Sequence, residues 1–387
     1  MSHADKYNIL YPFQHGFRKF SSCETQLIEF IDDVIQNLDD GKQADVLIMD
    51  FSKAFDKVSH NLLMHQQEHY GIRGIINNWM KSFLSGRTQA VIVEGETSTY
   101  LPLDSGVPQG STLGPSLFLY YINDIATGLD STIRLFVDDI IAYLVIKSNS
   151  DALTLQRDLD KLAQWEQLWK MAFHPDKCNV LTISRNKTPK KFKYCLHDHV
   201  LESVDKVNNM GVTISDDLKW ESHINNICGK ANKTLGFLRR NLKIGSTSVK
   251  AQACKSLVRP SLEYACSVWD PHLKSDINTI EMDQRRAARY VTNRQRSTSS
   301  VGDMLQHLKW RSLEDRRRDA RLVMMYTISQ GKVAVSKSDS LSPPLRHSRN
   351  MHSRSYQVPL CRTQQRKASF SPRTTVDSGT AYLRQQC

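Results

Sequence analysis

The chain has 387 residues, of which 40% are hydrophobic and 24% charged, so it is long enough to bury a large core and form two or three domains. No apolar run reaches the roughly 20 residues that a membrane-spanning helix needs, and the N-terminus has no signal-peptide pattern. Eight cysteines are scattered without a Cys-x-x-Cys pair, so the sequence indicates neither a zinc ribbon nor a disulfide scaffold. Reduced thiols in a cytosolic or nuclear compartment are expected.

The positive charge is concentrated in the last quarter of the chain. Residues 285–387 hold 21 Lys and Arg against 6 Asp and Glu, whereas residues 1–284 hold 31 against 34. This local excess of basic residues favours a polyanionic partner such as nucleic acid. A solvated basic tail without a specific partner remains the alternative for the final segment.

The first half of the chain alternates predicted helices and strands. A helix at about 24–38 precedes a strand that ends at Asp50, and its C-cap is Gly41. The following segments are predicted, in order, as a helix at about 60–70, a helix at about 75–84, and a hairpin formed by 89–93 and 99–103. A Gly- and Pro-rich loop at 105–115 then leads into a helix capped by Ser111 or Thr112, which continues through Leu117, Tyr121 and Ile125.

The next predicted segments complete a sheet. Residues 134–137 and 140–146 form a hairpin with Asp138 and Asp139 at its tip. Asp151 is expected to cap an amphipathic helix lined by Leu155, Leu159, Leu162, Leu168 and Trp169, and residues 179–184 form a final strand. The order of strand, helices, hairpin, helix and strand predicts a split β-α-β fold.

The second half is predicted to be mostly helical. Two short strands at 194–201 and 210–214 precede helices from residue 222 onward, with Pro260 and Pro271 breaking segments. These helices form a module of about 100 residues, whose arginines are candidates to contact phosphates: Arg285, Arg286, Arg289, Arg316, Arg317, Arg318 and Arg321. After Gly331 the chain is rich in Ser, Arg, Pro and Gln, which predicts disorder.

Two acidic stretches carry the chemistry. Asp50 follows the apolar run 46–49, and the pair Asp138 and Asp139 follows 135–137. Neighbouring buried strands would bring these carboxylates to one edge of a sheet, where their repulsion requires cations. Oxygen ligands favour Mg²⁺ or Mn²⁺, and a two-metal site with ions roughly 3.5–4 Å apart suits phosphoryl transfer. Because an isolated Asp-Asp pair is most often a turn, the hypothesis of nucleotide polymerisation depends on the motifs around it.

A second metal pattern lies in the helix at 60–70. His65, Glu68 and His69 match the H-x-x-E-H arrangement of some zinc hydrolases. An exposed polar helix face accounts for the same residues, because five-residue patterns occur by chance.

Several strings occur together in a characteristic order: QHGFRK at 14–19, DFSKAFDKVSH at 50–60, SGVPQGSTLGP at 105–115 and FVDD at 136–139. HPDKC at 174–178 and MGVTISDDLKW at 210–220 are weaker matches. On these motifs the sequence resembles the reverse transcriptases of non-LTR (LINE-type) retrotransposons, especially the jockey-like group, over about residues 8–330.

This resemblance implies an α+β fold, with a right-hand polymerase palm built on a ferredoxin-like antiparallel sheet and followed by an α-helical thumb. It implies an RNA-directed DNA polymerase that uses an RNA template, a DNA primer, deoxynucleoside triphosphates and two Mg²⁺ or Mn²⁺ ions. The expected segments are a residual fingers region at 1–45, the palm at 46–215, the thumb and C-terminal extension at 216–330, and a disordered basic tail at 331–387.

The resemblance also implies residue roles. Asp50, Asp138 and the carbonyl of Phe51 are expected to bind the metals, with Asp139 supporting the second ion and Lys177 acting as general acid. The residues expected to contact the nucleotide are Arg18, Phe55, Gln109 and Gly110, and Phe55 would exclude a ribose 2′-hydroxyl, which argues against an RNA polymerase. A strand at Met210-Gly211-Val212 would hold the primer, and the expected contacts to primer or template are Met210, Gly211, Arg285, Arg286 and Arg289.

Three departures from the family pattern stand out. Val137 replaces the usual alanine before the acidic pair, a change between small apolar residues, and Asn209-Met210 replaces an aromatic-leucine pair. The finger strands and the endonuclease that the family places upstream of Gln14 are not in this sequence, which suggests a truncated element. A catalytically inactive remnant that only binds nucleic acid is therefore the alternative function.

Overall fold

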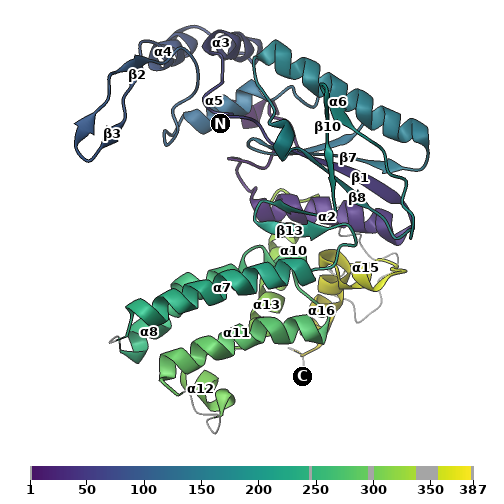
Figure 1. Cartoon of the computed structure of the whole chain (residues 1–387). Coiled ribbons are helices and arrows are strands. Elements are labelled where there is room, and N and C mark those ends of the chain that lie inside the picture. The colour runs from purple at the N-terminus through teal and green to yellow at the C-terminus, as the bar shows by residue number, and fades with distance from the viewer. Residues whose placement is uncertain (1, 244–245, 295–299, 337–355, 385–387) are drawn as a thin grey trace. The chain divides into compact units, whose positions relative to one another are not determined.

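The structure is a computed structural model that describes residues 2–243, 246–294, 300–336 and 356–384 (Figure 1). Its contacts divide the chain into two compact units. The first, here called the sheet unit, comprises Met1–Ser22, Gln43–Thr182 and Lys187–Val204. The second, the helical unit, comprises Cys23–Lys42, Ile183–Asn186 and Asp205–Cys387. Together they give an α+β protein. Within the described ranges, no helix is long and apolar enough to cross a membrane.

A five-stranded sheet forms the centre of the sheet unit, in the order β11-β8-β1-β7-β6. The strands are β1 (Gln43–Met49), β6 (Thr132–Phe136), β7 (Asp139–Ile146), β8 (Asn179–Ile183) and β11 (Glu202–Val204). β7 pairs antiparallel with both β1 and β6, and β11 pairs parallel with β8. Their apolar runs are buried, and helix α6 (Asn149–Trp169) packs against β7 along one face of the sheet (Figure 1). The predicted order of strand, helices, hairpin, helix and strand is confirmed.

The segments between β1 and β6 follow the prediction closely. The helices are α3 (His60–His69), α4 (Ile75–Leu84) and α5 (Gly114–Tyr121). The predicted hairpin is present as two short pairs, β2 (Thr88–Gln89) with β5 (Leu101–Pro102) and β3 (Ile92–Val93) with β4 (Glu96–Thr97). The N-cap of α5 is Leu113 rather than Ser111 or Thr112, and the helix ends at Tyr121, before Ile125. The Ser111 hydroxyl nevertheless accepts a hydrogen bond from the Gly114 amide at 2.9 Å.

Two predicted boundaries in the sheet unit shift by a few residues. Asp139 is the first residue of β7, so the hairpin turn consists of Val137 and Asp138 rather than the two aspartates. The N-cap of α6 is Ser148, and Asp151 is its partner three residues later, accepting the Ser148 amide at 2.8 Å. This reciprocal capping box explains why an acidic residue at that position was mistaken for the cap itself.

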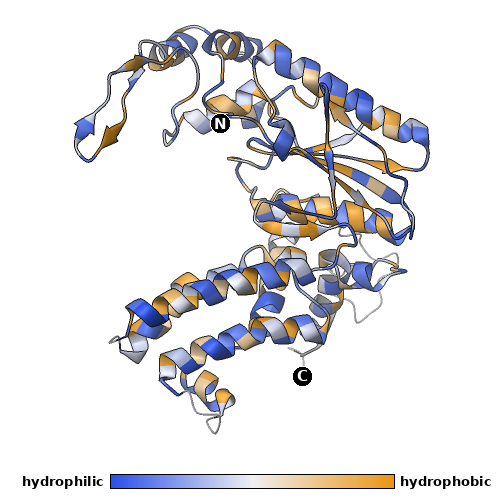
Figure 2. Cartoon of the chain, viewed as in Figure 1, coloured by the Kyte–Doolittle hydropathy of each residue, from blue (hydrophilic) through white to orange (hydrophobic). Residues whose placement is uncertain are grey.

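The helical unit begins with α2 (Cys23–Asp39) and a hairpin of β12 (Lys206–Asn209) and β13 (Val212–Ser215). Its other elements are α7 (Glu221–Asn241), α8 (Thr247–Ala253), η2 (Cys254–Val258), α9 (Arg259–Glu263), α10 (Cys266–Trp269), α11 (Lys274–Thr292), α12 (Val301–His307), α13 (Leu313–Ser329), α15 (Gln364–Ala368) and α16 (Phe370–Arg384). Apolar and polar residues are interleaved along the long helices α7 and α11 (Figure 2). Their amphipathic pattern buries one side of each helix, as predicted.

Two local predictions in the helical unit were wrong. Met210 and Gly211 are the two-residue turn between β12 and β13, not a strand, with φ values of 44° and 82°. A turn with two positive φ angles matches the twist of a hairpin. It was not predicted because such turns usually begin with asparagine, aspartate or glycine, and Met210 is apolar. Pro260 does not break its helix, because η2 is a π-helical turn whose wider spacing lets the Arg259 amide bond the carbonyl of Cys254 just before the proline.

The expected disorder of residues 331–387 is wrong for residues 356–384, whereas 337–355 and 385–387 lie outside the described residues. Asp39 on α2 accepts hydrogen bonds from the amides of Arg362 and Thr363 at 2.9 and 2.6 Å. Arg366 forms a buried ion pair with Asp32, which also belongs to α2. The predicted boundaries at 45 and 331 also differ from the observed units, since α2 and the C-terminal helices both belong to the helical unit. Disorder was predicted from the low aliphatic content of this segment, but the contacts that hold it to α2 are hydrogen bonds and an ion pair.

Candidate active site

The predicted acidic cluster lies at one end of β1 and β7. Met49 pairs with Ile140 in the antiparallel register, so Asp50 falls opposite Asp139, and Asp138 occupies the adjacent turn. Burial and the charge of Asp50 raise the pKa of Asp138. Burial, followed by the charges of Asp138 and Asp50, raises the pKa of Asp139 to about 6. Asp50 is therefore close enough to disfavour the ionised forms of both Asp138 and Asp139.

Lys177 neutralises part of this charge. It ends η1 (Pro175–Lys177), a short 3-10 turn, and its Nζ donates to the Asp50 Oδ2 at 2.9 Å. The backbone brings it there, because the His174 amide donates to the Asp50 carbonyl at 2.9 Å. The hydrogen bond to Asp50 and the charge of that carboxylate raise the pKa of Lys177. The structure thus joins two of the predicted catalytic residues directly.

A backbone bridge to Phe173 fixes the orientation of Phe51. Phe51 and Phe173 form an antiparallel bridge whose hydrogen bonds are made by their neighbours, from Ser52 to Ala172 and from His174 to Asp50. In such a pair the central carbonyl points away from the partner. The Phe51 carbonyl is therefore directed toward the side of β1 on which β7 lies.

The donor set fits a hard divalent cation, although the atoms do not form a closed coordination shell. Carboxylate and carbonyl oxygens are the ligands that Mg²⁺ and Mn²⁺ prefer. Burial and the neighbouring carboxylates raise the pKa values of Asp138 and Asp139, so a bound cation would stabilise their ionised forms. Across residues 2–243, 246–294, 300–336 and 356–384, no group of three or more His, Cys, Asp and Glu is arranged as a metal-binding cluster.

The residues of the zinc pattern lie on the exposed side of α3. His65, Glu68 and His69 are all exposed on α3, whose buried side chains are Leu63 and Gln67. Glu68 accepts a hydrogen bond from Asn77 at 2.9 Å, which anchors α3 to α4. These residues form an exposed helix face, which was the alternative interpretation.

The glycine-rich loop packs against the segment that follows Asp50. The Gly106 amide donates to the Val58 carbonyl, and the Val107 amide donates to the Phe55 carbonyl, each at 2.8 Å. Gly106 has a φ of 90°, and a Cβ there would lie 2.9 Å from the carbonyl oxygen of Asp56. The close approach of the two backbones therefore requires glycine.

Three of the four predicted nucleotide contacts, Phe55, Gln109 and Gly110, are thereby brought to one region. The half-buried Phe55 ring stacks on Phe118 with 4.6 Å between centroids. Gln109 is exposed, with its amide 3.4 Å from the carboxylate of Asp56, and Gly110 is exposed beside it. A ligand can reach this loop without a rearrangement of the core.

Arg18 is differently placed. Its guanidinium donates to the backbone carbonyl of Tyr11 at 3.1 Å and lies 3.9 Å from the carboxylate of Asp5. These contacts hold the N-terminal segment and use donors that a triphosphate would need. A nucleotide-binding role for Arg18 stays a prediction.

The predicted primer and template contacts belong to the helical unit. The Tyr264 hydroxyl donates to the Met210 carbonyl at 3.0 Å, which braces the β12-β13 turn. Arg285 is exposed on α11, and Arg289 is partly buried. Arg286 forms an ion pair with Asp283 at 2.6 Å while remaining largely exposed.

Other arginines of the predicted phosphate-binding set are structural. Arg317 is fully buried and donates to Asp270 at 2.7 Å. Arg321 is also buried and contacts the same carboxylate at 2.9 Å and Asp377 at 2.8 Å. The prediction that Arg317 and Arg321 grip phosphates was wrong, because their guanidinium groups are enclosed by the protein.

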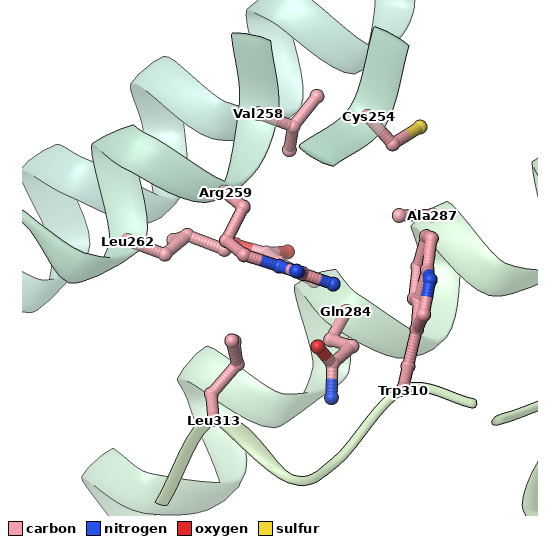
Figure 3. Close-up of a pocket in the computed structure, with 9 residues that line it drawn as sticks. Cys254, Val258, Arg259, Leu262, Gln284, Ala287, Trp310 and Leu313 are labelled. Carbon is pink, nitrogen blue, oxygen red and sulfur yellow. The ribbon is translucent and has the colours of Figure 1, made fainter. Parts of the chain in front are cut away.

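A small pocket in the helical unit is unrelated to the carboxylates. It has a volume of about 20 Å³, enough for a single water. Arg259, Gln284 and Trp310 line it together with apolar side chains, and the Arg259 guanidinium lies over the Trp310 ring at 5.2 Å (Figure 3). Its size excludes a nucleotide.

One residue at the acidic edge had no role in the sequence interpretation. Gln14 is buried, and its carboxamide contacts the backbone of Val137, just before Asp138. The only signal in the sequence was its place in the QHGFRK string.

The chain is similar to known proteins over most of its length. A model of the family described as reverse transcriptase (RNA-dependent DNA polymerase) matches residues 2–214. The RNA-directed DNA polymerase from mobile element jockey of Drosophila melanogaster is 27% identical over 78% of this chain and 35% of its own length. The probable RNA-directed DNA polymerase from transposon BS of the same organism is 27% identical over 74% of this chain and 33% of its own length.

The chain therefore spans about a third of the curated relatives it matches. Among solved structures, apo telomerase from Candida tropicalis has 12% identity and a TM-score of 0.45, covering 86% of this chain and 53% of that chain. Reverse transcriptases generally use divalent metal ions, in agreement with the oxygen donors described above. The family model covers more than half of the 387 residues, and the chain belongs to the reverse transcriptase family, with the jockey-like non-LTR elements among its relatives.

Proposed function

We propose that this chain carries the polymerase centre of a non-LTR retrotransposon and extends a DNA primer on an RNA template with deoxynucleoside triphosphates. The observation that carries the proposal is the meeting of Asp50, Asp138, Asp139 and Lys177 at one edge of the sheet. In this proposal the sheet unit contains the palm, and the helical unit contains the thumb and the C-terminal extension.

The acidic edge would hold two Mg²⁺ or Mn²⁺ ions through Asp50, Asp138 and the Phe51 carbonyl, with Asp139 supporting the second. Such ions supply charge stabilisation for the attacking and leaving oxygens of an in-line displacement. The exposed ammonium of Lys177 already lies at Asp50, so it is placed to donate a proton to the departing pyrophosphate.

The Phe55 ring and the glycine-rich loop form the proposed nucleotide site. Phe55 is held against Phe118, so its ring has a fixed position from which to exclude a ribose 2′-hydroxyl. Gln109 and Gly110 present polar atoms at the exposed side of the same loop. This arrangement favours deoxynucleotides and argues against an RNA polymerase.

The helical unit would supply sequence-independent contacts to primer and template. Met210 and Gly211 form a braced turn that can approach a nucleic-acid backbone closely, and Arg285 and Arg286 are exposed on α11. Such contacts to phosphates weaken as salt rises. An RNA template and the free cysteines of the described residues suit a cytoplasmic or nuclear compartment.

Primer extension tests the proposal. The full chain is incubated with a DNA-primed RNA template, deoxynucleotides and Mg²⁺ or Mn²⁺, and product length is measured. Asp138→Asn should abolish extension, while the matched control Asp198→Asn, at an exposed position between β9 (Cys195–Leu196) and β10 (His199–Val200), should leave it unchanged. Equal products from both variants would show that the signal comes from another enzyme.

Binding without extension is the second candidate function. Salt-sensitive binding of the primed template, with no product from the wild-type chain, would identify a nucleic-acid-binding remnant. The basic balance of residues 285–387 favours such binding, although several of these arginines are committed to internal ion pairs.

A further inference from the structure

The turn that carries Asp138 has an unusual backbone. Phe136 pairs with Asp139, which leaves Val137 and Asp138 as a two-residue hairpin loop. Val137 has a φ of 58°, in the left-handed region that a β-branched residue rarely adopts. Hairpin turns with a positive φ at this position normally use glycine, asparagine or aspartate. A specific interaction is therefore needed to hold the turn in this conformation.

Gln14 supplies that interaction. Its carboxamide oxygen accepts a hydrogen bond from the Val137 amide at 3.0 Å, and its nitrogen lies 3.4 Å from the Val137 carbonyl. The same oxygen also accepts the Gly16 amide at 2.7 Å. One side chain, 123 residues away in sequence, thus contacts both polar groups of the strained residue.

The backbone around Gln14 is itself fixed to β6. The Leu135 amide donates to the Phe13 carbonyl at 3.0 Å, and the His15 amide donates to the Leu135 carbonyl at 2.9 Å. Gln14 is only 3% exposed, so its carboxamide has few alternative orientations. The segment therefore acts as a rigid support for the turn.

Gly16 completes the contact by leaving room for it. A Cβ at Gly16 would lie 2.4 Å from the Val137 Cγ2 and 2.5 Å from the Val137 nitrogen. Any side chain at this position would displace Val137 or break the hydrogen bond from its amide. The left-handed turn thus depends on both a hydrogen-bonding group and a close backbone approach.

We propose that Gln14 is a positioning residue for the acidic edge: its carboxamide holds Val137 in the left-handed conformation and thereby sets the direction of Asp138 and Asp139. Gln14 itself touches no substrate. The inference concerns the geometry of the carboxylates, and it rests on the proposed function only where polymerisation is the readout.

The test uses Gln14→Met, which keeps the volume and removes the hydrogen bonds. The matched control is Gln67→Met, because Gln67 is also buried in the sheet unit but its amide atoms have no hydrogen-bond partner. Amide hydrogen exchange of the full chain, without metal or substrate, is followed at Val137. Exchange there should accelerate at least tenfold in Gln14→Met and stay unchanged in Gln67→Met. Equal exchange in the two variants would overturn the proposal.

A rescue experiment separates positioning from simple packing. Glycine adopts a positive φ without strain, so Val137→Gly should make the turn less dependent on Gln14. In the valine background, Gln14→Met should raise the Mn²⁺ concentration for half-maximal binding at least tenfold; in the glycine background the change should be under threefold. Equal changes in both backgrounds would contradict the role. If Gln14→Met alone does not fold, the Val137→Gly single variant is compared with the Gln14→Met/Val137→Gly double variant. A tenfold difference between these two chains in the Mn²⁺ concentration for half-maximal binding refutes the proposal.

These measurements distinguish the two hypotheses. A wild-type chain that fails to extend a primer, but whose Val137 amide loses protection in Gln14→Met, would overturn the proposed function and support the positioning role. In an active chain, Gln14→Met should lower kcat and shift the Mg²⁺ optimum, with little change in KM for the nucleotide. A change in KM alone would assign Gln14 to substrate binding and overturn the proposal.

Discussion

A buried histidine makes the stability of the helical unit depend on pH. His223 on α7 is 1% exposed, and its Nδ1 accepts a hydrogen bond from the Thr213 amide at 3.1 Å. Its ring packs edge-on against Trp269. Burial, with a smaller contribution from the charge of Lys230, lowers its pKa to about 4. The neutral ring therefore joins α7 to the hairpin that carries Met210.

The size of the effect follows from the difference between folded and unfolded states. The pKa of His223 falls from 6.5 to about 4 on folding, and each unit corresponds to about 1.4 kcal/mol, so the contribution is about 3 kcal/mol. Because the folded pKa is the lower one, the unfolded chain takes up the proton first as pH falls. This stability is complete above pH 6.5 and is lost progressively toward pH 4.

Denaturant unfolding of the full chain at a series of pH values measures the effect. His223→Asn is the reference, because its amide oxygen can accept the Thr213 bond without titrating in this range. Subtracting the variant's curve removes the contribution of other groups. The difference in unfolding free energy should fall by about 3 kcal/mol between pH 7 and pH 4. Parallel curves would mean that His223 is protonated or accessible in the folded state, and the reasoning would be refuted.

Three further substitutions test other parts of the structure. Phe55→Ala should raise ribonucleotide relative to deoxynucleotide incorporation at least about tenfold, measured as a ratio of kcat/KM; an unchanged ratio would remove its proposed selectivity role. Asp270→Asn should lower the unfolding free energy by about 3–5 kcal/mol, because it leaves the buried Arg317 uncompensated; a loss below about 1 kcal/mol would contradict this. Gly211→Ala should destabilise by about 1–2 kcal/mol, since its φ is 82° and a Cβ would lie 3.1 Å from the Tyr264 ring; unchanged unfolding would show that the turn rearranges freely.

The acidic edge could be predicted from sequence because its signals are local. Each carboxylate directly follows a buried apolar run, so the strand pattern places it at a strand end. The helix at Ile75–Leu84 was predicted to its observed bounds for the same reason, since apolar spacing ends at Leu84 and a glycine follows soon after. Lys177, in contrast, was reached only through the family motif, because nothing in its neighbourhood indicates Asp50 as its partner.

Predictions failed for charged residues whose function depends on a partner that is distant in sequence. Arg317 and Arg285 look alike in sequence, since each is an arginine in a basic helix. The first is fully buried against Asp270 and the second is exposed. The C-terminal segment failed similarly, because Asp39 and Asp32, which bind it, lie more than 300 residues earlier. Amino-acid composition gives the number of charged residues but does not show which of them form ion pairs with one another.

Val137 shows the limit of judging a substitution by size. As a replacement for alanine it adds only two methyl groups, yet its φ of 58° makes β-branching, rather than volume, the relevant property. The group that stabilises this conformation belongs to the QHGFRK string, and the strained residue belongs to FVDD. These two motifs, which the sequence presents as separate, form one structural unit at the acidic edge. A valine at this position is therefore tolerable only with the Gln14 carboxamide in place, which is why substitution of the two residues is expected to be non-additive.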